Sequence, residues 1–149
     1  MFLGEYRHSI DNKDRLTVPA RYRELMDEGA YILRGFDRNL MVYTTKAFES
    51  ITNRLNQMSV TDPLARSLRR LIIGSASRVE IDKAGRILIP DFLCQKAGIS
   101  YDKDAVLVGQ GNYFEIWSSD EWALQQKSFD EAEANTERFK VLDLSTSSG

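Results

Sequence analysis

The sequence contains few of the residues on which disulfide frameworks, metal clusters and imidazole catalysis depend. Its 149 residues include one cysteine, one histidine and three prolines. Cys94 alone excludes an internal disulfide and a multi-cysteine metal cluster. A catalytic dyad built on imidazole would depend on His8, which lies in an ordinary strand pattern of mixed polarity. We therefore predict neither an enzyme nor a cofactor or metal site.

Long apolar runs are also missing. No stretch approaches the roughly 18 apolar residues that a membrane helix needs. The first seven residues lack the basic flank and apolar stretch of a signal peptide. A hydrophobic fraction of 42% with 28% charged residues supports a packed core rather than a disordered chain. We expect a soluble protein of the cytoplasm with no membrane partner.

The chain has no excess of positive charge. Twenty basic residues face 22 acidic ones, a net charge of -2, which argues weakly against a nucleic-acid partner. The distribution is uneven, however. Residues 1–74 hold 12 basic and 9 acidic residues, whereas residues 75–149 hold 8 and 13. Seven acids lie between residues 120 and 143, so net charge averages unlike regions.

The chain contains an internal repeat. Residues 10–19 (IDNKDRLTVP) align with residues 81–90 (IDKAGRILIP) at an offset of 71. Further on, residues 31–43 align with residues 105–117 at an offset of 74. We therefore predict a first repeat with connecting helices at 1–74, a second with a C-terminal helix at 75–144, and a disordered tail at 145–149.

Each copy predicts the same order of elements: strand, turn, strand, short helix, strand pair and longer helix. Thr45 and Ser118 are the predicted N-caps of the longer helices, and another helix should begin at Asp62 and Pro63. Aromatic residues at matched positions favour core packing over base stacking. Because a copy of some 50 residues is marginal alone, the two copies should pack together.

The repeat preserves the pattern Asp-x-x-x-Arg, as Asp11 with Arg15 and as Asp82 with Arg86. In a turn between two strands, the carboxylate can accept hydrogen bonds from turn amides. The arginine would then project from the rim, where its guanidinium suits phosphate or guanine, and a two-stranded ribbon fits the major groove of DNA. An ion pair that merely stabilises the turn is the alternative.

Other candidate sites are weaker. The basic cluster of Arg66, Arg69 and Arg70 lies on a predicted helix, where a solvated face or a subunit contact is at least as plausible as a DNA contact. Gly109 and Gly111 belong to a hairpin and lack the rest of a dinucleotide fingerprint. Cys94 is expected to be a small core or boundary residue. An enzyme centred on His8 or Cys94 remains the least favoured alternative.

At these residues the sequence resembles the MraZ family, a two-repeat branch of the AbrB-like swapped-hairpin transcription factors. The opening residues 1–6, the two Asp-to-Pro blocks at 11–19 and 82–90, and residues 35–43 and 97–99 support the resemblance. The resemblance implies an α+β fold, in which two tandem AbrB-like swapped-hairpin β-barrel half-units with flanking helices form one pseudo-two-fold unit.

The resemblance also implies a function. Family members are cytoplasmic, nucleoid-associated regulators of the bacterial cell-division and cell-wall gene cluster. They bind short repeats in double-stranded promoter DNA as ring-shaped homo-oligomers, with no small-molecule substrate expected. By motif position, Arg15 and Arg86 would be the principal DNA contacts, joined by Lys13 and Lys83. Asp11 and Asp82 would shape the turns.

Some positions depart from the family pattern. Asp14 stands where family members usually have glycine, whereas the second copy keeps Gly85. Aspartate tolerates left-handed backbone better than most residues, but its charge beside Arg15 would weaken a phosphate contact. Cys94 and Thr45 replace the commoner arginine and proline. The main alternative function is an antitoxin-like interaction or scaffold module whose acidic tail, from Asp120 onward, binds a protein.

Overall fold

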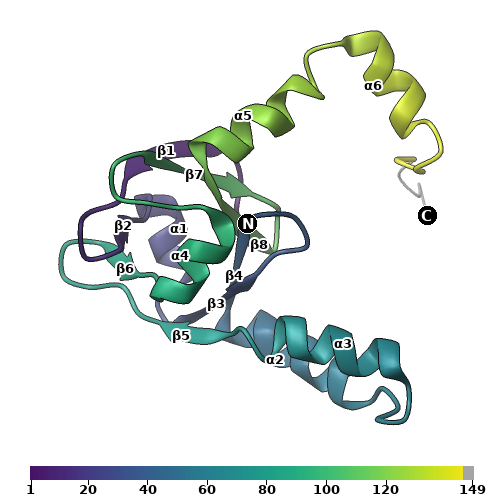
Figure 1. Ribbon diagram of the computed structural model, residues 1–149, viewed down its shortest axis with the longest axis horizontal. Helices are drawn as coiled ribbons and strands as arrows, with labels where there is room; N and C mark the ends of the chain where they lie inside the picture. Colours follow the sequence, from purple (N-terminus) through teal and green to yellow (C-terminus); the bar gives the residue numbers. More distant parts are fainter. Residues whose placement is uncertain (146–149) are drawn as a thin grey trace.

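The computed structural model describes residues 1–145 of the chain and confirms a mixed α+β fold (Figure 1). The first copy contains β1 (Glu5–Ser9), β2 (Arg15–Thr17), α1 (Ala20–Leu25), β3 (Ala30–Arg34), β4 (Leu40–Thr44), α2 (Thr45–Asn56) and α3 (Pro63–Ile72). The second contains β5 (Ser77–Val79), β6 (Arg86–Leu88), α4 (Asp91–Ala97), β7 (Asp104–Gly109), β8 (Tyr113–Ser118), α5 (Ser119–Lys127) and α6 (Ala132–Phe139). The predicted order of elements therefore occurs in both copies.

The two copies exchange strands. Six strands form an antiparallel sheet in the order β1-β7-β8-β4-β3-β5, and β2 pairs with β6 in a separate ribbon. The first strand of each copy thus pairs with the third strand of the other copy, as β1 with β7 and β5 with β3. If each strand is replaced by its equivalent in the other copy, the same strand order results, read from the opposite edge of the sheet. The two halves are therefore interdependent parts of one pseudo-two-fold unit.

The barrel part of the expectation needs correction. Within residues 1–145 the large sheet stays open, with β1 and β5 at its two edges. The ribbon strands β2 and β6 form ladders only with each other, and β5 has just three residues. Because neither edge strand is joined by a ladder to the ribbon, the pairing does not close into a barrel.

Aromatic side chains pack in the interior, as their matched positions predicted. The Tyr22 ring lies at the centre of the main core, 4.9 Å from the Phe114 ring. Elsewhere three pairs form across the strands and helices: Tyr31 with Phe48, Tyr43 with Tyr113, and Trp117 with Trp122. These contacts favour a structural role for the aromatic residues over base stacking.

The helix starts agree with the predictions at two of three positions. The Ser118 hydroxyl accepts a hydrogen bond from the Glu121 amide at 3.1 Å, and Asp62 accepts one from the Leu64 amide at 2.9 Å. The prediction of Thr45 as an N-cap was wrong by one residue. Thr44 accepts from the Ala47 amide at 3.2 Å, because its extended backbone places it just before the first helical turn.

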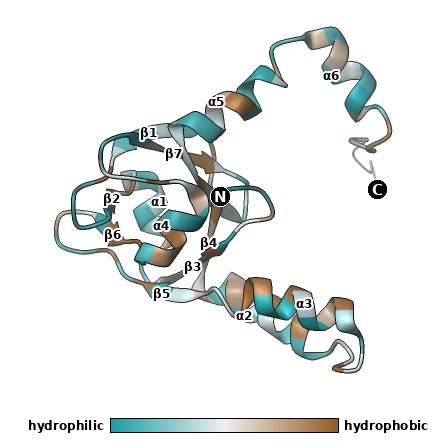
Figure 2. Ribbon diagram, viewed as in Figure 1, coloured by the Kyte–Doolittle hydropathy of each residue, from teal (hydrophilic) through white to brown (hydrophobic). Residues whose placement is uncertain are grey.

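Two helical arms project from the body of the molecule (Figure 1). The α2–α3 arm buries an apolar face that includes Phe48, Leu55 and Ile72, and Figure 2 shows apolar residues along both of its helices. In the other arm, α6 has no buried residue. Of the predicted tail at 145–149, residues 146–149 lie outside the described residues. No helix of the described part is long and apolar enough to cross a membrane.

Candidate nucleic-acid interface

The carboxylate of Asp11 organises the first of the two Asp-x-x-x-Arg turns. Its Oδ1 atom accepts hydrogen bonds from the backbone amides of Lys13 and Arg15, both at 2.9 Å. The Asp11 carbonyl also accepts from the Asp14 amide at 3.1 Å. Above all, the hydrogen bond from the Arg15 amide lowers the pKa of Asp11 to about 2. The aspartate is therefore ionised and holds the turn at neutral pH.

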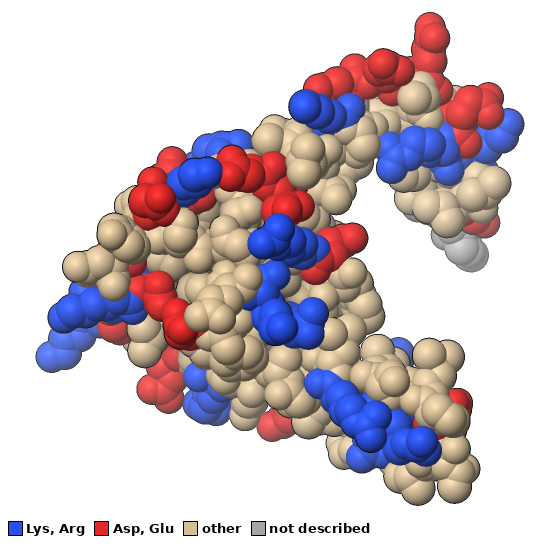
Figure 3. Space-filling view, viewed as in Figure 1, with Lys and Arg blue, Asp and Glu red and all other residues tan. Residues whose placement is uncertain are grey.

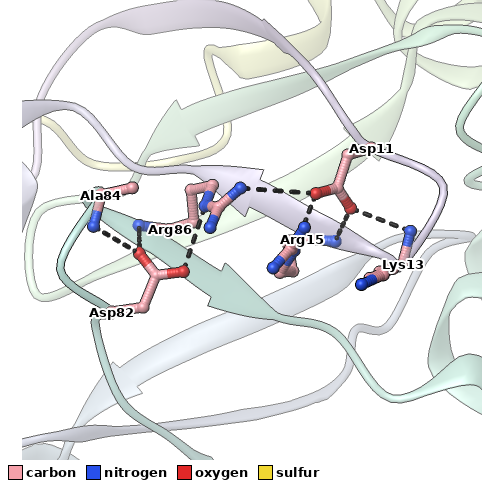
Figure 4. Close-up of polar contacts among 6 residues, drawn as sticks. All are labelled: Asp11, Lys13, Arg15, Asp82, Ala84 and Arg86. Atoms are coloured by element: carbon pink, nitrogen blue, oxygen red, sulfur yellow. Dashed lines mark hydrogen bonds and ion pairs between the residues drawn. The ribbon is translucent and has the colours of Figure 1, made fainter.

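The second turn repeats this geometry. Oδ1 of Asp82 accepts hydrogen bonds from the amides of Ala84 and Arg86, both at 2.9 Å (Figure 4). The bond from the Arg86 amide is the main cause that lowers the pKa of Asp82. Asp82 thus makes the same two backbone hydrogen bonds in the second turn as Asp11 makes in the first, 71 residues earlier.

Each carboxylate also orients the arginine of its own turn. Nε of Arg15 lies 2.7 Å from Oδ2 of Asp11, and Nε of Arg86 lies 3.1 Å from Oδ2 of Asp82. One contact crosses between the turns, because Nη1 of Arg86 lies 3.5 Å from Oδ2 of Asp11 (Figure 4). The side chains of Arg15 and Arg86 are 32% and 29% exposed. Both guanidinium groups are thus held at the surface through Nε.

The β2–β6 ribbon places the two arginines on one face. Arg15 is opposite Leu88, and Thr17 is opposite Arg86. Leu16 and Ile87, which alternate with them, are fully buried on the other face. Because side chains alternate along a strand, the outer face presents Arg15, Thr17, Arg86 and Leu88 together. Leu88 is 60% exposed, so its side chain is available at this surface.

The ribbon is continued by hydrogen bonds that link each turn to the other copy. The Val18 amide donates to the Gly85 carbonyl and the Ile89 amide donates to the Asp14 carbonyl, both at 2.9 Å. Asp14 and Gly85 adopt left-handed backbone with φ of 61° and 80°. Aspartate therefore keeps the turn conformation that glycine adopts in the second copy, as the sequence predicted.

The two predicted lysine contacts also lie at this end of the molecule. Lys13 and Lys83 are exposed, and neither side chain forms an ion pair within residues 1–145. Figure 3 shows basic side chains gathered at the end of the molecule where the β2 and β6 turns lie, with acidic side chains nearby. The four basic residues named from the sequence are therefore brought together.

The basic cluster of α3 is not part of this surface. Arg66, Arg69 and Arg70 lie on the α2–α3 arm, at the opposite end of the molecule from the two turns (Figures 1 and 3). Arg66 Nη1 donates to the Val60 carbonyl at 2.8 Å, and Arg69 Nη2 donates to Asn56 at 3.3 Å. These bonds hold the arm together.

The residues considered for catalysis do not form a site. Cys94 is buried on α4, and burial is the main cause that raises the pKa of its thiol to about 12, so that the reactive thiolate is disfavoured. His8 is half-buried on β1, opposite Ala105. The part of the chain that the structure describes contains no cluster of three or more metal-ligating histidine, cysteine or carboxylate side chains.

Three residues that lie on or against the β2–β6 ribbon and its turns were not identified from the sequence. Thr17 and Leu88 lie on the outer face of the ribbon, and Arg23 packs against the second turn. The alternation of Thr17 with Leu16, and of Leu88 with Ile87, could have identified the first two. No local pattern could have identified Arg23, because it comes from the helix of the other copy.

Comparison with known proteins agrees with this architecture. The family model described as "MraZ protein, putative antitoxin-like" matches residues 1–71 and again residues 72–142. A protein of Herpetosiphon aurantiacus named "Transcriptional regulator MraZ" is 44% identical over 145 residues, which cover 97% of this chain and 100% of that relative. Proteins with the same name from Thermomicrobium roseum and Nitrosospira multiformis are 41% and 44% identical, over 84% and 86% of this chain and 87% and 88% of their own lengths.

The names of these relatives support a role in transcription regulation, and transcriptional regulators are generally not enzymes. Two successive matches of one family model also agree with the internal repeat and with the symmetric exchange of strands. With nearly the whole chain covered, the protein belongs to the MraZ family.

Proposed function

We propose that this protein regulates transcription by binding double-stranded promoter DNA through the outer face of the β2–β6 ribbon. The observation that supports this proposal is the placement of Arg15 and Arg86 on that face, each held through Nε by the aspartate of its turn. A two-stranded ribbon has the dimensions to enter the major groove, where arginine is the commonest reader of guanine.

The held geometry gives each side chain a separate task. An arginine bound through Nε keeps Nη atoms for a base edge or a phosphate, both of them in Arg15 and Nη2 in Arg86, whose Nη1 also contacts Asp11. The fixed orientation lowers the entropy lost on binding. Lys13 and Lys83, exposed on the turns, would contact backbone phosphates. Thr17 and Leu88 offer methyl groups, which suit contact with a thymine methyl group.

Assembly would supply the affinity that one chain lacks. Four basic residues per ribbon make single-site binding weak, and the net charge of the chain is -2. A ring-shaped homo-oligomer that engages successive short promoter repeats would raise affinity through effective concentration. The target proposed from the family resemblance is the cell-division and cell-wall gene cluster, with the protein associated with the nucleoid. The boundary between repeats at residues 74 and 75 stays a prediction.

Substitution of the two arginines tests this function. Arg15→Ala and Arg86→Ala should each weaken binding to the DNA upstream of the protein's own gene by about tenfold or more, the usual range for a charged hydrogen bond. Arg70→Ala, on the distant α3 arm, is the matched control and should leave binding unchanged. Unchanged affinity in both folded turn variants would disprove the DNA role of the ribbon.

A protein-interaction module is the second candidate. The α5–α6 arm carries exposed apolar side chains, among them Phe129, Phe139 and Leu142, beside acidic residues. The description "antitoxin-like" of the matching family model agrees with a protein partner. A stoichiometric partner retained by the Arg15→Ala and Arg86→Ala variants, together with unchanged DNA binding, would favour this function over the first.

A further inference from the structure

The helix of each copy packs on the turn of the other copy, but with different side chains. In the second turn, the guanidinium of Arg23 from α1 lies directly against Gly85. A β-carbon added to Gly85 would lie 1.7 Å from Nη1 of Arg23. The residue equivalent to Arg23 at the offset of 71 is Cys94 on α4. There the turn residue equivalent to Gly85 is Asp14, which carries a side chain.

The two differences between the copies therefore occur at matching helix and turn positions. A long arginine occupies the space beside a glycine that has no β-carbon, and a short, buried cysteine belongs to the copy that packs on a turn with an aspartate. The carboxylate of Asp14 is close enough to contribute, after burial, to the raised pKa of Cys94. The pairs Arg23–Gly85 and Cys94–Asp14 thus occupy equivalent places in the pseudo-two-fold unit.

Because these residue pairs differ, the two turns carry unequal charges. Residues 11–15 contain two acids and two bases, Asp11 and Asp14 with Lys13 and Arg15, and their formal charge is zero. Residues 82–86 contain one acid and two bases, which leaves one positive charge. Arg23 adds a second positive charge against Gly85 of that turn, in a hollow that is also lined by Asp27, Glu28 and Glu80, whereas Cys94 adds none.

Within residues 1–145, Arg23 forms no ion pair with an acidic side chain. It lines a hollow of about 410 Å³ together with Asp27, Glu28 and Glu80, but no carboxylate in residues 1–145 lies within 4.0 Å of its guanidinium. Glu80 pairs with Arg78 instead, at 3.5 Å. By contrast, Arg15 and Arg86 both pair with aspartates. Of these three arginines, Arg23 is the one without an ion pair in the described part of the chain.

We propose that Arg23 is a phosphate-binding residue of the second turn, and that the two turns of one chain bind DNA unequally, the second more strongly than the first. This proposal depends on the proposed function of the ribbon. Arg23 supplies a half-buried guanidinium against Gly85, the residue that precedes Arg86 in the turn, which suits a backbone phosphate near the base that Arg86 would read. At the first turn, the negative charge of Asp14 repels phosphate at the corresponding place.

The test compares substitutions at the two equivalent helix positions of the full-length protein. The probe is a labelled duplex of the DNA directly upstream of the gene, with a scrambled duplex of equal length, titrated over a series of salt concentrations. Arg23→Ala should weaken binding about tenfold and reduce the slope of log affinity against log salt by about 0.9, the loss of one phosphate contact. Cys94→Ala, the matched control, should change neither quantity.

Two more variants keep the proposal testable if Arg23→Ala does not fold. Arg23→Lys retains the charge and should retain the salt slope. Asp14→Gly removes the repelling carboxylate and should raise affinity several-fold.

If Arg23→Ala binds as Cys94→Ala does while Arg86→Ala is impaired, the role of Arg23 is disproved and the proposed function stands. If Asp14→Gly brings no gain, the inequality of the turns is disproved. Unchanged binding by Arg15→Ala and Arg86→Ala would disprove both proposals.

Discussion

The guanidinium of Arg86 lies 3.5 Å from the carboxylate of Asp11, so that the arginine of the second copy contacts the aspartate of the first. Asp11 also binds Arg15 at 2.7 Å. No corresponding pair between Arg15 and Asp82 occurs in the described chain. One carboxylate therefore orients both arginines of the proposed DNA surface, and Asp82 orients only one.

This asymmetry predicts unequal effects of the two aspartates on DNA binding. Asp11→Asn should impair the function of both arginines, and Asp82→Asn that of Arg86 alone, so the first substitution should weaken DNA binding more. A double-mutant cycle should show coupling between Asp11→Asn and Arg86→Ala and additive effects for Asp82→Asn with Arg15→Ala. The measurement is duplex affinity by fluorescence anisotropy, and equal losses for the two aspartate variants would contradict the prediction.

The depressed pKa of Asp11 predicts a loss of stability in acid. Its pKa is lowered in the fold from 3.8 to about 2, and that of Asp82 is lowered too. The stabilisation they supply is complete above the unfolded value of 3.8 and is lost as pH falls from about 4 towards 2, because the unfolded chain binds protons first.

Urea unfolding at a series of pH values from 5 to about 2 measures this effect. The Asp11→Asn variant should show a weaker fall of the unfolding midpoint with acid than the unchanged protein. Asp27→Asn, at an exposed position that forms no ion pair within residues 1–145, is the control and should follow the unchanged protein. Parallel curves for Asp11→Asn and the unchanged protein would contradict the role assigned to the carboxylate.

Substitutions at two neighbouring residues of β6 should affect the stability of the protein and its DNA binding separately. Ile87 is fully buried under the ribbon, whereas Leu88 is 60% exposed on its outer face. Ile87→Ala should therefore lower the free energy of unfolding by about 2 to 5 kcal/mol. Leu88→Ala should change it by less than about 0.5 kcal/mol, as expected for a surface substitution, and yet weaken binding to the upstream duplex. Chemical denaturation and anisotropy test both statements, and a large loss of stability in Leu88→Ala would contradict the assigned faces.

The cap of α2 gives a prediction about the α2–α3 arm. Thr44 accepts a hydrogen bond from the Ala47 amide, so Thr44→Ala should cost about 1 kcal/mol of unfolding free energy. Thr44→Ser retains the hydroxyl and is the control. DNA binding should persist in both variants, because the arm lies at the far end of the molecule from the turns. Equal stability of the alanine and serine variants would show that the cap does not contribute.

Much of the local structure follows from short-range patterns in the chain. The repeated Asp-x-x-x-Arg blocks predicted two equivalent turns, because an aspartate bonds to amides two and four residues away. The starts of α3 and α5 followed from Asp62 and Ser118. The misplaced cap at Thr45 has a simple cause. Two adjacent threonines offer the same hydroxyl, and only the backbone torsion of Thr44 distinguishes them.

Contacts between the copies could not be predicted in this way. A repeat indicates two similar units but does not state whether a strand pairs within its own copy or with the other. The exchange of β1 and β5 depends on the packing of both sheets around one core, and it leaves the sheet open where closed half-units were expected. Of the residues missed at the surface, Arg23 follows the same rule, since it reaches the second turn from α1 of the first copy.

The order of residues thus decided the duplication, the turn chemistry and the alternation that buries Leu16 and Ile87, because each of these depends on neighbours a few positions apart. The folded structure decided which copy supplies each partner. It brought Asp11 to Arg86 and Arg23 to Gly85 across some 60 to 75 residues of chain. Such pairs form only when the strands of both copies have already packed together, since the core and not the local sequence holds them in place.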